Sequence, residues 1–324
     1  MEKQSKRRHD RCYLISSKFE YEETISSAYG PAYAEHMGWE VAELDNAETA
    51  IREHPVVLVD TRYDEKECER LRNLVREHRG TMFGFSVIDP YSWTVDQPYW
   101  STLFEVKGEP NVFFLSRYQP KELTAELAEN PGDQLVVIPY AFVDPIIPVD
   151  GFDERAWKVV HSGRHNVNRY PYRQTFYRLQ KWIPPFQSYI DVLGHPGYPD
   201  VGEDIGHDIV GDDYVRFLAG YTFMFVSPSR LYLEFLKFRE CAMAGCVPVG
   251  VPPDGFHDDI RRPFVDGPFG SFLRSGLRLP GILRMDPGEA EERARAYREA
   301  FAQHRNPQVL NEKLDAFLAE TGRI

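Results

Sequence analysis

The sequence predicts an α/β protein of two Rossmann-like domains that face a cleft. Three observations support this prediction. Short apolar runs alternate with helical stretches in both halves of the chain, these runs lack a clean polar and apolar alternation, and a turn-rich segment separates the two sets. Strands of this kind are buried on both faces, and in alternation with helices they form a parallel, doubly wound sheet. Ligands of such sheets bind beyond the carboxyl ends of the strands.

Composition and charge narrow the class of protein. The chain has 324 residues, enough for two domains, and 42% hydrophobic with 14% aromatic residues indicates globular structure throughout. Its formal net charge of -12 argues against nucleic-acid binding through a basic face. The four cysteines form no CxxC pair, which predicts reduced thiols and argues against a zinc site.

The apolar runs and the N-terminal residues of the chain indicate where in the cell we expect the protein. No apolar run reaches the length of a membrane span, and the N-terminus has no signal-peptide pattern, so we expect a cytoplasmic protein. The basic run KQSKRRHDR near the N-terminus is either a solvated terminus or a weak peripheral contact with an anionic membrane.

The first half supplies the first predicted sheet. After the second apolar run, the spacing from Cys68 to Val75 predicts a helix that Gly80 stops. Asp60 and Asp89 each close a strand, where ligands of such sheets bind, although a turn or capping role is the alternative for each. The predicted strands are residues 11–17, 55–61, 81–89, 111–117 and 134–142.

A segment rich in Pro and Asp, residues 143–154, separates this set from a second one. We place the domain boundary there, giving an N-terminal domain of residues 1–147 and a C-terminal domain of residues 148–324. The C-terminal helices are candidates to pack back on the N-terminal domain. In the second set we expect strands within residues 157–164, 188–199, 221–228 and 246–251, with helices between them and a mostly helical tail.

The stretch EFLKFRECAMAGCVPVGVPP, residues 234–253, predicts a helix that stops on glycine and runs into a short strand. At about 100° per residue, Lys237 and Glu240 share one row of this helix, beside the row that faces the core. One interpretation is an i,i+3 ion pair on a solvated face. The predicted core row consists of Leu231, Phe235, Phe238 and Ala242.

The alternative interpretation is a ligand site. Ala244 and Gly245 are small enough for close approach of a ligand. Ser227 and Ser229 precede the helix, where free N–H groups and the helix dipole favour phosphate. A lysine suits phosphates and a glutamate suits ribose hydroxyls, so this row fits a nucleotide.

The segment SPSRLYLEFLKFRECAMAGCVPVG resembles the donor-binding segment of GT-B glycosyltransferases, in particular the group-1-like transferases that include the CgeB-type proteins. The stretch HSGRHNVNRYPYR is similar to the first strand and turn of that family's C-terminal domain. The residues that carry the resemblance are Gly163, Arg164, Tyr170, Pro171, Arg173, Lys237, Glu240, Ala242, Ala244, Gly245, Pro248 and Val249.

The resemblance implies a nucleotide-sugar donor, UDP- or GDP-linked, bound mainly by the C-terminal domain, with no other cofactor. Glu240 would accept hydrogen bonds from the ribose, and Arg164 and Lys237 would stabilise the diphosphate in place of a metal. Gly163 would let the backbone approach the phosphates. His195, on a turn after a strand, is either structural or a contact to base or phosphate, and Arg164 is alternatively a surface turn residue.

The resemblance departs at one position. Many group-1 transferases carry two glutamates eight positions apart. The second of them matches Glu240, and Tyr232 stands at the position of the first. The role of that first glutamate therefore does not transfer. An inverting reaction would need a general base from the N-terminal domain, for which Asp89, Asp60 and Glu23 are the candidates.

We therefore expect a metal-independent, hexosyltransferase-like glycosyltransferase, of the kind used in polysaccharide biosynthesis. It would act on a hydroxyl of a glycan, lipid-linked or small-molecule acceptor. A non-catalytic nucleotide-sugar or carbohydrate-binding protein of the same fold, and a nucleotide-sugar epimerase, are the alternatives.

Overall fold

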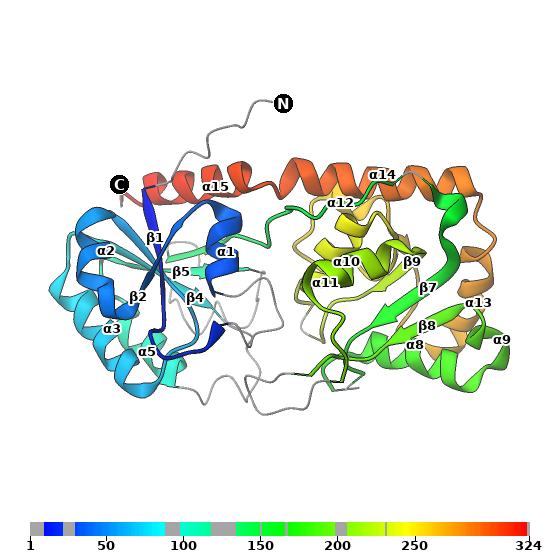
Figure 1. The fold of residues 1–324 in the computed structure, drawn as a ribbon, viewed down its shortest axis with the longest axis horizontal. Coiled ribbons are helices and arrows are strands. Elements are labelled where there is room, and N and C mark those ends of the chain that lie inside the picture. Colours follow the sequence, from blue (N-terminus) through cyan, green and yellow to red (C-terminus); the bar gives the residue numbers. More distant parts are fainter. Residues whose placement is uncertain are drawn as a thin grey trace. The chain divides into compact units, whose positions relative to one another are not determined.

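The computed structural model describes residues 10–21, 30–87, 98–117, 134–149, 151–165, 168–197, 206–230 and 232–322. The chain forms two compact units, one of Met1–Ala141 with Pro307–Ile324 and one of Phe142–Asn306. Figure 1 shows that each contains a sheet flanked by helices. The chain thus leaves the first unit six residues before the boundary expected at residue 147, and its last helix groups with the first unit.

The first unit is built on a parallel sheet in the order β2-β1-β3-β4-β5-β6. Every residue of β3, β4 and β5 is buried, as the lack of alternation in the sequence predicts. β2 differs, because it is an edge strand with mostly exposed residues. The strands are β1 (Arg11–Ile15), β2 (Glu40–Glu43), β3 (Val56–Val59), β4 (Met82–Val87), β5 (Val112–Ser116) and β6 (Leu135–Val137).

Helices cover both faces of this sheet. Phe83 and Phe85 of β4 pack with α2, α3 and α5, whereas Tyr13 of β1 and Phe113 of β5 contact rings on α1 and α15. The helices are α1 (Gly30–Met37), α2 (Ala47–Glu53) after the 3-10 turn η2 (Leu44–Asn46), α3 (Glu65–Glu77), α5 (Pro98–Val106) and α15 (Pro307–Glu320).

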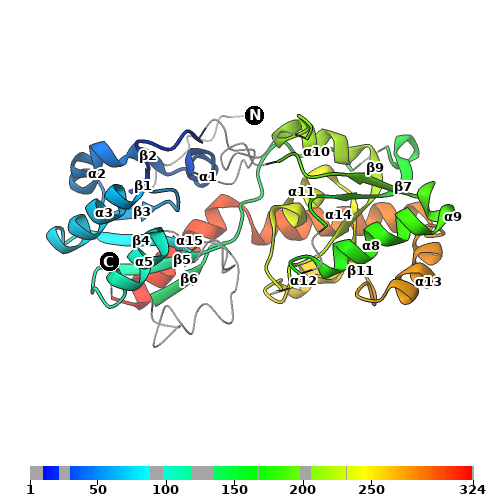
Figure 2. The same cartoon turned by 90° about the horizontal axis from the view of Figure 1, so that it is seen from below.

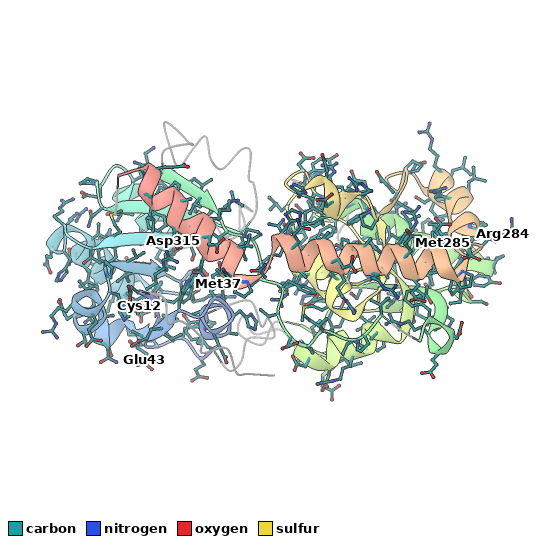
Figure 3. The ribbon with its side chains drawn as sticks, turned by 90° about the horizontal axis from the view of Figure 1, so that it is seen from above. Cys12, Met37, Glu43, Arg284, Met285 and Asp315 are labelled. Carbon is teal, nitrogen blue, oxygen red and sulfur yellow. The ribbon has the colours of Figure 1, made fainter. Side chains whose placement is uncertain are left out.

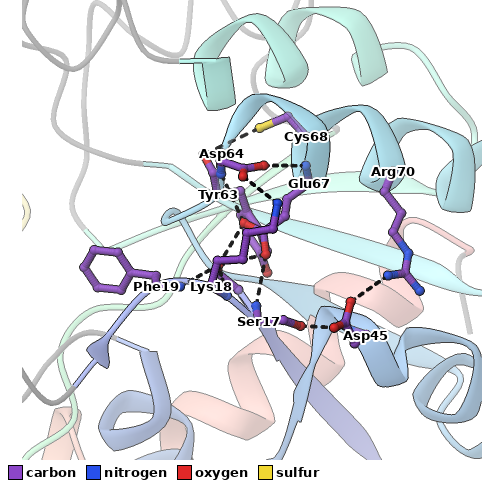
Figure 4. Close-up of polar contacts among 10 residues, drawn as sticks. Ser17, Lys18, Phe19, Asp45, Tyr63, Asp64, Glu67, Cys68 and Arg70 are labelled. Atoms are coloured by element: carbon purple, nitrogen blue, oxygen red, sulfur yellow. Dashed lines mark hydrogen bonds and ion pairs between the residues drawn. The ribbon is translucent and has the colours of Figure 1, made fainter.

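A capping box starts α3. The Asp64 side chain accepts from the Glu67 N–H, and the Glu67 side chain accepts from the Asp64 N–H (Figure 4). Glu67 also accepts from the Ser16 hydroxyl and the Ser17 N–H, so the cap ties α3 to the end of β1. The predicted apolar face, including Cys68, is buried.

The helix α15 is held to the first unit by a buried asparagine. The Asn311 Oδ1 accepts from Arg11 at 2.8 Å and from the Trp39 indole at 2.7 Å, and its amide donates to the Met37 carbonyl at 2.9 Å. Arg11 also pairs with Asp315, and Figure 3 places Met37 and Asp315 near each other along this helix. Residues about 300 positions apart in the sequence thus complete one core.

The second unit contains a parallel sheet in the order β11-β10-β9-β7-β8. Alternate residues face opposite layers: Phe223 and Phe225 of β9 pack toward α8 and α13, and Met224 packs toward α10 and α11. The strands are β7 (Ala156–Ser162), β8 (Ile190–Leu193), β9 (Tyr221–Val226), β10 (Val247–Gly250) and β11 (Val265–Asp266).

Helices fill both layers of the second unit (Figure 2). The long helix α14 contributes to both, because Ala294 packs in the layer with α8 and Phe301 in the layer with α11. The helices are α8 (Pro171–Trp182), α9 (Pro184–Gln187), α10 (Gly211–Ala219), α11 (Leu236–Ala244), α12 (Asp258–Arg261), α13 (Phe272–Ile282) and α14 (Pro287–His304), with the 3-10 turn η3 (Phe152–Glu154) before β7.

The four cysteines, Cys12, Cys68, Cys241 and Cys246, are buried and carry free thiols. Within the described ranges, no helix combines the length and the apolar character that a bilayer crossing requires.

Candidate functional site

The end of β7 brings two cations against a glycine. Gly163 follows the strand with φ of 98°, a conformation that favours glycine. A Cβ at this position would lie 3.0 Å from Cε of Lys237 and 3.2 Å from Nη1 of Arg173. Lys237 comes from α11 and Arg173 from α8, so helices on opposite faces of the sheet converge at its carboxyl edge. This is the edge at which ligands of parallel sheets bind.

Lys237 lies in the first turn of α11. That turn holds no acidic residue, and the N-cap residue Phe235 makes no side-chain cap. The N-terminus of a helix carries partial positive charge from its free N–H groups, and Lys237 adds a full charge to it. With Arg173 beside it, the cluster has the charge distribution of an anion site.

The Lys237 ammonium is held by a tyrosine. Its Nζ donates to Oη of Tyr214 at 3.1 Å and lies 4.7 Å from the ring centroid. Tyr214 is buried on α10 and shares a second hydrogen bond with the Ser162 hydroxyl, at the end of β7. Burial lowers the pKa of Lys237 to about 8, attraction from Glu240 partly offsets this, and Arg173 lowers it further. The ammonium is therefore poised to gain from a nearby anion.

A buried hydroxyl lies at the same edge of the sheet. Ser227 directly follows β9, the strand that pairs in parallel with β7, so it lies at the carboxyl edge where Gly163 follows β7. Ser227 is 1% exposed, yet its hydroxyl has no hydrogen-bond partner in the structure. Buried polar groups are normally satisfied, so this hydroxyl is available to donate to a ligand oxygen at this edge.

Glu240 lies one turn after Lys237 and is partly buried. It is near enough to raise the pKa of Lys237, and it adds to the raised pKa of Tyr214, which is caused first by burial. Among the described residues, no ion pair within 4.0 Å joins Lys237 to Glu240, and the lysine bonds to Tyr214 instead. The i,i+3 ion pair considered from the sequence is therefore absent.

Arg164 and His195 reach the same edge of the sheet. Arg164 follows Gly163 and is partly buried. Ser162 pairs with Leu193, and Arg164 and His195 each follow two residues beyond that pair. The His195 Nδ1 accepts from the Gly197 N–H at 2.9 Å, which gives that nitrogen a structural role in the turn.

Ala244 and Gly245 do not join this cluster, contrary to the expectation of close ligand approach. They end α11, at the amino edge of the sheet. The Ala244 carbonyl accepts from Arg155 at 3.2 Å, and a Cβ on Gly245 would collide with the Arg298 guanidinium. Gly245 has φ of 67° because it caps the helix. Both residues serve packing.

The helix α11 also begins later than the sequence predicts. It starts at Leu236, so Phe235 precedes it and Ser227 and Ser229 do not lie at its N-terminus. Phe238 and Ala242 are buried as predicted, and Leu231 lies outside the described residues.

Arg173 is the site residue that sequence reasoning did not single out as a ligand. It is buried, and its guanidinium carbon lies 4.4 Å from the Tyr170 ring centroid and 5.4 Å from that of Phe235. The sequence feature that could have identified Arg173 is its place in the YPYR stretch. Helical spacing alone could not show that it meets Lys237.

Glu234 has a structural role. It is buried and pairs with Arg305 at 3.0 Å. Burial raises the pKa of Glu234, and Arg305 lowers it.

Of the three candidate bases, the structure describes Asp60. Asp60, after β3, is 0% exposed, and its two carboxylate oxygens accept from Tyr13 at 2.7 Å and Tyr21 at 2.8 Å. Tyr13 in turn accepts from Arg117 at 3.2 Å. An enclosed carboxylate with both oxygens engaged suits a structural role better than proton abstraction. Asp89 and Glu23 lie outside the described residues.

Solved structures with low sequence identity to this chain share its fold. An α-glucosyltransferase in complex with UDP matches with a TM-score of 0.62 and 11% identity, covering 95% of this chain and 99% of its own. An α-glucosyltransferase has also been solved with UDP and a 13-mer DNA containing an HMU base. It matches with a TM-score of 0.58 and 10% identity, covering 95% of this chain and 98% of its own. A UDP-forming α,α-trehalose-phosphate synthase from Burkholderia vietnamiensis matches with a TM-score of 0.53 and 14% identity, covering 88% of this chain and 75% of its own.

These neighbours are GT-B glycosyltransferases, so the chain has the GT-B type of fold, as the sequence predicts. No protein-family model matches the chain, and no curated protein matches it.

Proposed function

We propose that the protein is a glycosyltransferase whose second unit binds the diphosphate of a UDP- or GDP-sugar. The cluster at the end of β7 carries the proposal: Lys237 and Arg173 converge on Gly163. The buried hydroxyl of Ser227, which follows the neighbouring strand β9, has no hydrogen-bond partner. Preorganised cations and donors are what a departing diphosphate requires. The UDP bound by the α-glucosyltransferase neighbour supports the same ligand class.

Each residue has a proposed part. Lys237 and Arg173 pair with phosphate oxygens, Ser227 donates to one of them, and Gly163 leaves room for the ligand. Glu240 accepts from the ribose hydroxyls, and Arg164 and His195 border the nucleotide. These cations would supply the charge that a metal supplies elsewhere, so we propose metal-independent transfer of a hexose.

The acceptor side belongs to the proposal as well. We propose a hydroxyl of a glycan, lipid-linked or small-molecule acceptor, in cytoplasmic polysaccharide biosynthesis by a group-1-like, CgeB-type enzyme. Because Asp60 is engaged by two tyrosines, Asp89 and Glu23 are the proposed bases.

Titration calorimetry with UDP and GDP tests the donor site. Lys237→Met should weaken nucleotide binding roughly tenfold to a hundredfold, since a charge-assisted hydrogen bond contributes about 1.5–3 kcal/mol. Glu240→Gln should weaken the binding of UDP but not the binding of pyrophosphate, because pyrophosphate lacks a ribose. The control Lys66→Met removes an exposed lysine of α3 and should change neither. No binding by the unaltered protein, or equal binding by Lys237→Met, would refute the assignment.

A non-catalytic nucleotide-sugar-binding protein of the same fold is the second candidate. The engagement of both Asp60 oxygens favours it, because it removes one candidate base. Slow release of free sugar from a bound donor would favour the transferase. Tight nucleotide binding without any hydrolysis or transfer would favour the binding protein.

A further inference from the structure

Helix α13 presents two leucines to solvent. Leu273 is 71% exposed and Leu277 is 74% exposed. They lie four residues apart and so share one face of the helix, opposite the buried residues Leu279 and Ile282. A single exposed leucine needs no explanation, but two adjacent ones at this exposure begin a surface patch.

A tryptophan extends this patch. Trp182, the last residue of α8, is 58% exposed, and its ring centroid lies 6.1 Å from that of Phe272, the residue before Leu273. Figure 2 shows α8 and α13 in the same part of the second unit, and a Cβ on Gly276 of α13 would contact Leu179 of α8. We call Trp182, Leu273 and Leu277 the apolar ridge.

The two segments that form the ridge are basic in an otherwise acidic chain. Residues 169–187 and 268–285 contain no Asp or Glu, although the chain has a net charge of -12. Arg178 lies 5.4 Å from the Trp182 ring centroid, and Arg274 and Arg278 follow the two leucines on α13. Within the described part of the chain none of the exposed cations of these segments forms an ion pair; they are Arg178, Lys181, Arg274, Arg278 and Arg284.

We propose that the apolar ridge and its cations dock the second unit on an anionic lipid surface. Exposed leucines and a tryptophan suit the boundary between headgroups and acyl chains, and unpaired arginines suit acidic headgroups. A second copy of the chain would bring like charges together, since the same surface would face itself. A nucleic acid would use the cations but would leave the leucines in water. This surface is separate from the nucleotide cluster and does not depend on the proposed function.

Vesicle co-sedimentation tests the proposal on the full chain. The protein should sediment with phosphatidylcholine vesicles that contain phosphatidylglycerol and remain in solution with pure phosphatidylcholine. The double variant Leu273→Glu, Leu277→Glu should lose at least about tenfold in partitioning, because it removes inserted apolar area and adds repelled charge. Both leucines are exposed, so the thermal midpoint should not change. The control Val309→Glu alters an exposed apolar residue of α15 and should bind like the unaltered protein.

Three results would overturn the proposal. The first is an unaltered protein that does not sediment with the anionic vesicles. The second is equal sedimentation of the double variant, which would assign binding to the basic run near the N-terminus. The third is binding to duplex DNA, but not to vesicles, that Arg274→Glu with Arg278→Glu abolishes. An unchanged UDP affinity in the double variant separates this test from the one for the donor site.

Discussion

At the scale of single residues, the candidate site brings the cations Lys237 and Arg173 together at the end of β7. Lys237 lies at the positive end of a helix, next to Arg173, and burial lowers its pKa to about 8. Such an arrangement costs stability in the free protein, and under the proposed function a bound diphosphate would offset that cost. The affinity of the site for its ligand is therefore expected to depend on pH.

Nucleotide affinity should fall as pH rises through about 8, because Lys237 loses the proton that pairs with phosphate. In the free protein the sign is opposite. The unfolded chain binds more protons than the folded one between pH 8 and 10.5, the ordinary pKa of lysine, so stability without ligand should rise with pH there. Calorimetry with UDP and thermal unfolding between pH 7 and about 10 measure the two trends.

The variant Lys237→Arg is the control for this prediction, because arginine keeps its charge throughout the range. Its UDP affinity should stay level where that of the unaltered protein falls. A parallel fall in both proteins would mean that another group titrates.

Gly163→Ala should reduce UDP affinity strongly. The added Cβ would crowd Lys237 and Arg173 at 3.0 and 3.2 Å, in addition to the backbone strain at φ of 98°. Gly108→Ala is a matched control, since Gly108 has φ of 89° and nothing within 4 Å of a Cβ. Both variants should lose about 1–3 kcal/mol of stability, but only Gly163→Ala should weaken UDP binding. Equal affinities for the two variants would contradict the site.

At the scale of elements, strong local patterns were predictable and tertiary ones were not. The apolar spacing of α3 and the buried runs of β3, β4 and β5 identified them correctly. β2 was not predicted, since its sequence EVAE is polar and pairs at an edge. The start of α11 was placed too early because Phe235 fits the helical row but adopts an extended backbone.

The candidate site shows the same division. Lys237, Glu240 and Gly163 could be found from spacing and a family resemblance. The approach of Arg173 to Lys237 could not, because it depends on helices from opposite faces of the sheet reaching one edge. The hydrogen bond from Lys237 to Tyr214 could not either, because it joins two helices that are neighbours only in the folded chain. Ala244 and Gly245 were assigned to the ligand only because the direction of the helix relative to the sheet is invisible in the sequence.

Asn311→Ala should destabilise the first unit by on the order of 3 kcal/mol. The change leaves the buried donors of Arg11 and Trp39 without their acceptor. Gln308→Ala, on the exposed side of the same helix, should cost less than about 0.5 kcal/mol. Chemical denaturation followed by tryptophan fluorescence measures both, and similar losses would show that Asn311 does not anchor α15.

At the scale of the whole molecule, the GT-B type of fold was predictable because each unit repeats the same alternation of buried strands and helices. The division of labour between the units stays a prediction. Hydrogen exchange with and without UDP tests it: protection should appear at residues 162–165, 227–230 and 236–240 of the second unit. Protection confined to the first unit would contradict a donor site at the end of β7.

The placement of α15 has a consequence for the order of folding during synthesis. Arg11, Trp39 and the Met37 carbonyl are made early, yet their shared partner Asn311 is made only after the whole of Phe142–Asn306. The first unit therefore begins translation first but cannot complete its core until the second unit has been made and α15 follows it. Until then its incomplete core is a part of the nascent chain that chaperones have reason to bind.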